Sequence, residues 1–312
     1  MKIFIVTMKN YEPFALLYLL LLIKTIKIFF SGINIDGKSP SLNILYYGII
    51  ADCPALSLIT KFLNHGGYFC CFYCYTKGYH NQQCKKRQYP LNLPLNVRGP
   101  ESFEIHAKRA EDTGEVVYAH IGRSELTDIL DVPFPISILC DYLNVTLLRH
   151  FQDVVKALSC SLVPGTRKDI DQKLRTQVFP HFFHRQMRGI EDLSFIKATE
   201  LRNLLLYVFL PRFYGVLPID QVAHISLFIC GIRLLHGSRE KFGDSTSFLA
   251  EKLLKLYYLH HPHYYDYLEN FVLHLHIHYS ENYQRHGALA SNNTFAQEDL
   301  IGYIASNRNG EL

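Results

Sequence analysis

The spacing of hydrophobic positions changes along the chain, and the change predicts a mixed α/β protein. Residues 44–51 (ILYYGIIA) are an apolar run rich in β-branched and aromatic residues, which favours a buried strand. Pro54 then opens ALSLITKFL, whose apolar residues recur at helical spacing until NHGG at residues 64–67. Asp52 therefore stands at the carboxyl end of a strand, where open α/β sheets collect functional side chains.

Helical spacing dominates the second half of the chain, so the fold class is α/β but mostly α by content. We expect an all-helical block over residues 140–265, and loops with a hairpin over residues 76–139, where periodicity is weak and turn residues are frequent. The amphipathic segments are residues 141–158, 195–210, 220–235 and 246–259.

The apolar run Phe14–Ile23 has two interpretations. A membrane span needs roughly 20 apolar residues, and Lys24 and Lys27 interrupt the pattern before that length is reached. We therefore expect a core helix packed against a sheet, with a membrane anchor over residues 14–30 as the alternative.

Composition sets broad limits. With 312 residues, of which 48% are hydrophobic, the chain has enough apolar material for one large domain or two ordinary ones. The net charge of +4 permits an anionic partner without requiring one, and we read the basic triplet at residues 85–87 as a solvated loop. Eight cysteines in a chain this long favour reduced thiols in an intracellular setting. Phosphate-binding glycine loops and a nucleophile elbow are missing, which argues against nucleotide hydrolysis and α/β-hydrolase chemistry.

Cys71 and Cys74 form a C-x2-C pair, a spacing that lets two thiolates bind one tetrahedral ion from a single turn. Far downstream, VLHLHIHY places His274 and His278 on one face of a helix; on a strand, His276 would join them. These four residues are our predicted Zn²⁺ site, because such half-sites pair as Cys2His2.

Other interpretations of these residues remain. The cysteines are also compatible with buried small hydrophobes or a redox pair, Cys70 is a possible substitute ligand, and the histidines are compatible with an ordinary polar face. We expect a wet loop at His260, His261 and His263.

Two carboxylates flank the predicted zinc site. Asp52 precedes Cys71 by nineteen positions (71 − 52), and Glu298 follows His278 by twenty (298 − 278). A zinc ion joining both ends of the helical block would bring these carboxylates into one neighbourhood, and paired carboxylates suit Mg²⁺ or Mn²⁺ in phosphodiester cleavage. The alternatives are a helix N-cap for Asp52 and a solvated helix-start residue for Glu298.

The segment GIIADCPALSLITKFLNHGGYFCCFYC at residues 48–74 resembles CACTA-type DDE transposases, in which a D-x-P-A turn precedes H-x-G-Y-x-x-C-x-x-C. That family is similar in layout to the Transib transposases and the V(D)J recombinase catalytic core. Further ordered blocks of the resemblance are Gly78, Arg98, residues 141–148 (DYLNVTLL), 197–207 (KATELRNLLLY), 273–279 (LHLHIHY) and 287–304 (GALASNNTFAQEDLIGYI).

The resemblance implies an incomplete RNase H-like core interrupted by a large all-helical insertion. Residues 1–75 would be the N-terminal part of that core, 76–139 a loop-rich segment, 140–265 the insertion, and 266–312 the H-x3-H segment with a closing core helix. It also implies a structural zinc ion, Mg²⁺ or Mn²⁺ at the catalytic carboxylates, transposon-end DNA as partner, a possible homo-oligomer, and the nucleus as location.

Matched position by position, Asp52 corresponds to the second catalytic aspartate and Glu298 to the final glutamate, with Glu200 in KATELR as the alternative. Cys71, Cys74, His274 and His278 correspond to the zinc ligands.

The chain also departs from the family. The first catalytic aspartate has no convincing match, since Asp36 lies only sixteen residues before Asp52 (52 − 36) and reads as a turn residue. Asn144 stands where a histidine is usual, and Cys53 and Leu56 depart from D-A-P-A-R. We therefore expect a transposase-derived fragment with little or no DNA cleavage of its own. The alternatives are a non-catalytic zinc-stabilised module that binds DNA or protein, and a membrane-anchored protein.

Overall fold

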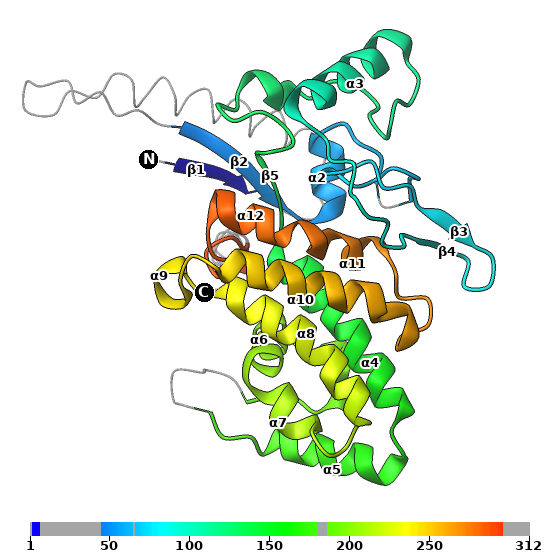
Figure 1. Cartoon of the computed structure of the whole chain (residues 1–312), viewed down its shortest axis with the longest axis vertical. Helices are drawn as coiled ribbons and strands as arrows, with labels where there is room; N and C mark the ends of the chain where they lie inside the picture. The colour runs from blue at the N-terminus through cyan, green and yellow to red at the C-terminus, as the bar shows by residue number, and fades with distance from the viewer. Residues whose placement is uncertain (1, 7–44, 65, 180–185, 296–312) are drawn as a thin grey trace, which may run out of the picture. The chain divides into compact units, whose positions relative to one another are not determined.

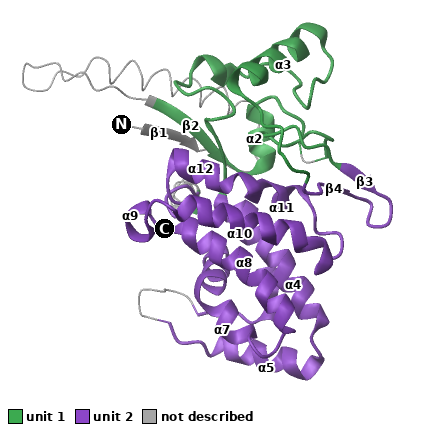
Figure 2. Ribbon diagram, viewed as in Figure 1, with its two compact units in different colours: residues 1–78, 92–141, 294–312 green, residues 79–91, 142–293 purple. Residues whose placement is uncertain are grey.

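The computed structural model describes residues 2–6, 45–64, 66–179 and 186–295 (Figure 1). Within these residues the fold is mixed α/β, mostly helical, with two small sheets. The chain forms two compact units (Figure 2). Unit 1 comprises residues 1–78, 92–141 and 294–312, and unit 2 comprises residues 79–91 and 142–293.

The three-stranded sheet of unit 1 is parallel throughout, in the order β1-β2-β5. Its strands are β1 (Lys2–Val6), β2 (Leu45–Ala51) and β5 (Ile138–Cys140). Ile49 pairs with Ile138 and Ala51 with Cys140, and these side chains are buried. The strand predicted at residues 44–51 is confirmed, and its apolar composition fits a strand covered on both faces.

Helix α2 (Cys53–Ile59) follows β2 directly, as predicted. Asp52 is its N-cap: Oδ1 accepts the backbone N–H of Ala55 at 2.9 Å, and Pro54 occupies the first turn, where no intrahelical donor is needed. The N-cap alternative for Asp52 is thus realised. The same residue is also at the carboxyl end of a central strand.

Helix α3 (Pro100–Thr113) contradicts the expectation of loops over residues 76–139. Its N-terminus has proline in the first turn, and it ends at Gly114, whose φ of 68° suits a residue without a side chain. Phe103, Ala107 and Ala110 are buried along one stripe, and the rest of the surface is mostly polar, with Ile105 exposed. The hydrophobic periodicity of the sequence did not reveal this helix, because two of the three buried residues are alanines, which are only weakly hydrophobic. A short 3₁₀ turn follows at η1 (Glu125–Asp128).

The predicted hairpin is confirmed and belongs to unit 2. Strands β3 (Tyr79–Asn81) and β4 (Lys86–Gln88) pair antiparallel. Lys85, with φ of 53°, lies in the turn, and both Lys85 and Lys86 are exposed. The basic triplet is therefore largely solvated at this turn.

The remainder of unit 2 is helical among its described residues. Most of the predicted block at residues 140–265 is helical, although two stretches are wound as π-helix. The elements are η2 (Leu143–Phe151, π), α4 (Gln152–Ser161), α5 (Pro164–Arg175), η3 (Ile190–Phe195, 3₁₀), α6 (Ala198–Asn203), η4 (Leu204–Val208, π), α7 (Phe209–Phe213), α8 (Ile219–His236), α9 (Arg239–Phe242), α10 (Thr246–His260), η5 (His261–His263, 3₁₀), α11 (Phe271–Leu275), η6 (His276–His278, 3₁₀) and α12 (Tyr279–His286).

Helices α8 and α10 pack against each other at the centre of unit 2 (Figure 1). Gly231 permits the close approach, since a Cβ there would lie 3.0 Å from the Leu254 side chain. Of the described helices, α8 is also the one long and apolar enough to cross a membrane by length and composition, with 44% of that window buried inside the protein. The run at residues 14–30 lies outside the described residues.

Candidate metal centre

The two thiols of the C-x2-C pair lie in a buried loop of unit 1. Cys71 and Cys74 have no exposed surface. The Nε–H of Arg98 donates to the carbonyl oxygens of both cysteines, at 3.0 and 3.1 Å. Gly78 N–H closes the loop on the Tyr68 carbonyl at 2.7 Å. The loop backbone is therefore fixed by hydrogen bonds that do not require an ion.

The sulfur atoms are set up for a cation. Cys71 Sγ accepts the backbone N–H of Tyr73 at 3.4 Å, and Cys74 Sγ lies 3.2 Å from Thr76 Oγ1. Burial, and then the neighbouring Cys74, raise the pKa of Cys71 well above its ordinary value. Because a metal binds the thiolate, loading the pair releases protons and supplies the positive charge that would stabilise two buried sulfurs.

The two imidazoles lie in consecutive helical turns of unit 2. Asn270 caps α11 by accepting the backbone N–H of Leu273 at 3.0 Å. His274 on α11 and His278 on η6 are buried, with ring centroids 5.4 Å apart. Of the two conformations that the sequence left open, helix and strand, this segment adopts the helix. His276 points elsewhere: its Nε2 lies 3.1 Å from Thr146 Oγ1.

The tautomer of His274 follows from its neighbours. The Tyr258 hydroxyl donates to the Tyr89 carbonyl oxygen and lies 3.3 Å from His274 Nδ1. Since its own proton is used on Tyr89, the hydroxyl accepts from Nδ1–H, which leaves the lone pair of His274 on Nε2. A metal-binding histidine is commonly oriented in this way through its second nitrogen. Sequence reasoning missed Tyr258, because no spacing rule connects it to His274.

The four predicted zinc ligands form one buried group. One ligand atom from each of Cys71, Cys74, His274 and His278 lies within 4.8 Å of all the others. In tetrahedral zinc coordination the ligand atoms are about 3.3–3.8 Å apart, and this chemistry of two thiols and two imidazoles is the set that zinc prefers. Over the part of the chain that the structure describes, no other set of three or more cysteine, histidine or acidic side chains is this compact. Cys70 is buried but outside the group.

Asp52 keeps one oxygen that the N-cap does not use. The side chain is 6% exposed, and Oδ2 is buried without a hydrogen-bond partner among the described residues. An ionised oxygen in that state is costly unless a cation or a proton compensates it. Glu298 and Asp36 lie outside the described residues.

Asp141 is a second carboxylate at this edge of the sheet, and the sequence reasoning assigned it no role. Its backbone N–H donates to the Ala51 carbonyl at 3.1 Å, and Asp141 directly follows β5 as Asp52 directly follows the neighbouring β2. Its fully buried carboxylate accepts the backbone N–H and the hydroxyl of Thr294, at 3.1 and 3.0 Å. Asp141 thus anchors the start of the closing segment.

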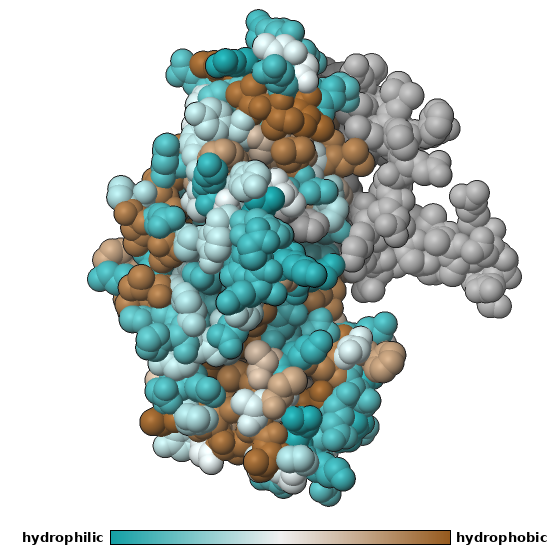
Figure 3. Space-filling view, turned by 90° about the vertical axis from the view of Figure 1, so that its right-hand side faces the viewer, coloured by the Kyte–Doolittle hydropathy of each residue, from teal (hydrophilic) through white to brown (hydrophobic). Residues whose placement is uncertain are grey.

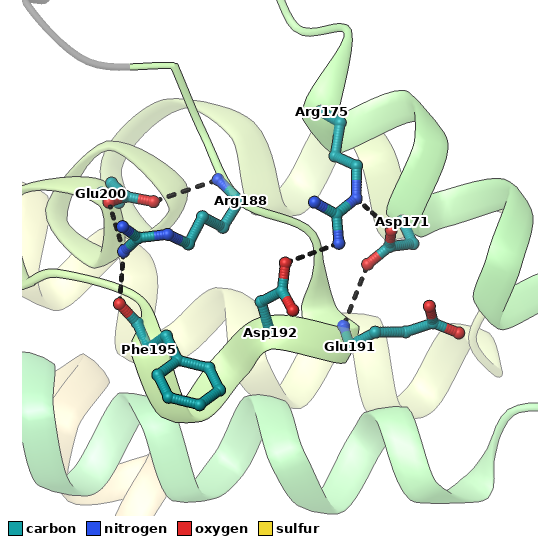
Figure 4. Close-up of polar contacts among 7 residues, drawn as sticks. All are labelled: Asp171, Arg175, Arg188, Glu191, Asp192, Phe195 and Glu200. Atoms are coloured by element: carbon teal, nitrogen blue, oxygen red, sulfur yellow. Dashed lines mark hydrogen bonds and ion pairs between the residues drawn. The ribbon is translucent and has the colours of Figure 1, made fainter.

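Glu200, the alternative catalytic carboxylate, is held in an ion pair (Figure 4). It is 1% exposed and accepts the backbone N–H of Arg188 at 3.0 Å and the guanidinium at 3.2 Å. Nearby, Arg175 bridges Asp171 and Asp192 at 2.6 and 2.7 Å. Both oxygens of Glu200 are occupied in stabilising the fold, which leaves it poorly suited to hold a catalytic ion.

The expectation of a wet loop at residues 260–263 is wrong for His261. This residue is fully buried, and its ring lies 5.5 Å from that of His150 and 4.7 Å from that of Tyr265. His263 is exposed, as expected. The buried neighbours of His261 are distant in the sequence, so the local polar pattern could not reveal them.

No protein-family model matches the chain, and neither a curated protein nor a solved structure matches it. Function therefore has to be inferred from the residues of the site and from the sequence resemblance.

Proposed function

We propose that the chain is a transposase-derived protein that holds one structural zinc ion in an incomplete RNase H-like core interrupted by a helical insertion. The observation that carries the proposal is the buried Cys71, Cys74, His274 and His278 group. The resemblance to DDE transposases implies these same four residues, and two of them are separated from the other two by about 200 positions (274 − 74).

Zinc would have a structural role at this site. Four protein ligands complete its tetrahedral shell and leave no position for a substrate, and Cys2His2 sets of this kind stabilise folds. The buried loop around the thiols and the Tyr258 contact to His274 support an ion held in a defined geometry.

DNA is the proposed partner, and divalent-metal-dependent strand cleavage and transfer is the ancestral reaction. Mg²⁺ or Mn²⁺ would be held by Asp52 with Glu298, and such ions activate the attacking water and stabilise the leaving oxygen. The buried Asp52 Oδ2 supports a cation-binding role for Asp52. Because the first catalytic aspartate has no match in the sequence, we expect little or no cleavage by this polypeptide. Location in the nucleus and assembly into a homo-oligomer belong to the same proposal.

A second candidate is a zinc-stabilised binding module without chemistry. It is favoured by the structural roles of the acidic residues, since Asp52 caps α2 and Glu200 pairs with Arg188. The membrane-anchored alternative depends on residues 14–30 and gains no support from the site.

The zinc framework is tested by metal analysis of the purified full chain. We expect about one zinc per molecule, lost together with cooperative unfolding in the double variant Cys71→Ser/Cys74→Ser, because binding and folding are coupled. Cys160→Ser is the matched control, since Cys160 is exposed. A wild-type chain that folds with no bound metal would refute the proposal.

A nicking assay on DNA with Mn²⁺ tests whether any catalysis is retained. A wild-type product that disappears in Asp52→Asn would show retained catalysis. Absence of product with zinc bound is what both the inactive core and the binding module require.

A further inference from the structure

Unit 1 contains an open cavity of about 720 Å³ beside the C-terminal end of α3, apart from the thiols and from Asp52. Its lining combines three aromatic side chains with charged ones: Tyr68, Phe69, Tyr118, Lys77, Arg109 and Glu115. Figure 3 shows hydrophobic surface at the level of α3, among otherwise polar side chains. We propose that this cavity binds an unpaired nucleotide of single-stranded DNA, with the base against the aromatic rings and the phosphate between the two cations.

The aromatic rings offer faces to a ligand. Tyr68 is 50% exposed and Tyr118 is 47% exposed, although each has a large apolar ring. Phe69 meets Tyr118 edge-on, with centroids 5.4 Å apart and an interplanar angle of 78°. Nucleobases stack on such rings regardless of sequence, which is how proteins hold single strands.

Positive charge lies beside these rings. Lys77 Nζ is 6.0 Å from the Tyr68 ring centroid and 5.9 Å from that of Phe69, and Arg109 joins the lining from α3. Glu115 contributes one negative charge, so the cavity carries a net charge of +1 (2 − 1). A base next to a phosphate matches this pairing of flat apolar faces with cations better than an uncharged ligand does.

The turn that carries Tyr118 is held in an unusual conformation. Val117 and His120 exchange backbone hydrogen bonds at 3.0 and 2.9 Å, and the two residues between them, Tyr118 and Ala119, have φ of 46° and 76°. Positive φ at both central positions of a tight turn suits glycine or asparagine and is disfavoured for a tyrosine. Such strain persists where the surroundings enforce it, typically at ligand-binding positions.

Arg98 enforces it here. Its Nη2 donates to the carbonyl oxygens of Tyr118 and Phe69, at 3.0 and 3.1 Å. The Tyr118 ring is further confined by Tyr75 and His106, whose centroids lie 5.3 and 4.8 Å away. The aromatic wall is thus ordered before any ligand arrives, which lowers the entropy lost on binding.

The assignment of this nucleotide to a DNA strand rests on the proposed function. The chemistry of the cavity alone is met by a free mononucleotide as well as by a strand, and a duplex hides its base faces in the stack. Competition between these three forms therefore identifies the ligand.

The experiment measures fluorescence anisotropy of a short labelled single-stranded oligodeoxynucleotide with the full chain, without added Mg²⁺ or Mn²⁺. Tyr118→Gly suits the positive φ, so it should keep or raise thermal stability while weakening binding by about ten-fold, as expected for one lost stacking contact. Tyr214→Ala is the control, because it removes an exposed tyrosine ring that lies outside the cavity.

The double variant Lys77→Ala/Arg109→Ala should lower the slope of log affinity against log salt by about 0.7, the value for one phosphate that is no longer neutralised. Lys108→Ala is the control, because Lys108 is an exposed neighbour on α3 outside the lining. Unchanged binding in both test variants would overturn the site. Equal competition by a mononucleotide or by the duplex would overturn the assignment to an unpaired nucleotide within a strand. Zinc content is measured on the same samples, so failure here is distinguishable from failure of the zinc framework.

Discussion

Basic side chains are buried in two different ways among the described residues. Unit 1 buries a permanent charge, the guanidinium of Arg98, whereas unit 2 buries several imidazoles close together. Both solutions avoid an isolated buried charge, but the first satisfies the charge with hydrogen bonds and the second removes it by giving up protons.

Arg98 donates to carbonyl oxygens from two parts of unit 1 through Nε and Nη2, whereas its buried Nη1 has no hydrogen-bond partner among the described residues. Its donors reach the carbonyls of Cys71, Cys74, Phe69 and Tyr118, and its guanidinium lies 4.2 Å from the Tyr75 ring centroid. Burial lowers the pKa of Arg98 from its ordinary value. Arginine nevertheless remains charged in proteins, so one side chain orders both the thiol loop and the Tyr118 turn.

Three imidazoles of unit 2, those of His150, His224 and His261, are buried as neutral bases. Burial is the main cause that lowers the pKa of His261 to about 3 and that of His224 to about 4, and it lowers the pKa of His150 well below its ordinary value. Their partners are neutral: His150 Nε2 lies 2.9 Å from the Tyr257 hydroxyl, and His224 Nε2 lies 2.9 Å from the Tyr257 carbonyl oxygen. The comparison teaches that a group titrating near neutrality can be buried without a counter-charge, at the cost of sensitivity to acid.

The strongest way to break this comparison is to remove the buried charge. Arg98→Met should lower the free energy of unfolding by roughly 3–5 kcal/mol, because several carbonyl oxygens lose their donor at once. Urea unfolding at neutral pH measures the effect. Arg98→Lys restores the charge without the planar fork and should recover only part of the loss. Wild-type stability in Arg98→Met would mean that the carbonyls do not depend on the guanidinium.

The second prediction concerns how protein stability depends on pH through the buried histidines of unit 2. His150, His224 and His261 have folded-state pKa values below the unfolded value of about 6.5, so the unfolded chain binds more protons than the folded chain between those values. The contribution of each such histidine to the free energy of unfolding is complete above about pH 6.5. It is lost as the pH falls toward the folded-state pKa, by at most about 1.4 kcal/mol per pH unit. We expect urea midpoints to fall steeply between neutrality and mild acid.

The variant His261→Phe tests whether the buried histidines cause this decrease in the free energy of unfolding with falling pH. Both ring nitrogens of His261 are buried without a hydrogen-bond partner in the part of the chain the structure describes, so an apolar ring of similar shape should fit. The variant should lose about one histidine's share of the acid sensitivity, while His263→Phe, at an exposed position, should keep the wild-type slope. Equal slopes in wild type and His261→Phe would show that this cluster does not govern acid unfolding.

The smallest expected effects on stability come from two ion pairs of unit 2, one buried and one exposed. Glu200→Gln removes the charge facing Arg188 and should cost about 1–2 kcal/mol in thermal or urea unfolding. Asp192→Asn loosens a pair whose side chains are 44% and 40% exposed and should change stability by about 0.5 kcal/mol or less. An equal cost for both would remove the distinction that burial draws between them.

Several elements were predictable because their information is local. Strand β2 and helix α2 follow from an apolar run, a capping aspartate and a proline, all within about fifteen residues of the sequence. Helix α3 was missed although its proline start and glycine end were visible, because alanines at 107 and 110 contribute weakly to a hydrophobic pattern.

In the candidate metal centre, too, the residues recognisable from local sequence spacing were predictable and the others were not. The identities of the candidate metal ligands were readable from the C-x2-C and H-x3-H spacings, since each half-site is one turn of chain. The roles of Tyr258, Asp141 and Arg98 were not, because each acts on residues far away in the sequence.

The sequence by itself determined which residues can bind a soft cation and which local segments are strand or helix, since both depend on side-chain chemistry and short-range periodicity. Only the tertiary structure decided which polar side chains are buried and what they meet there: His261 among other rings, Glu200 on Arg188, and Tyr118 on a strained turn under Arg98. Burial and partnership depend on long-range packing, and a one-dimensional pattern does not record it.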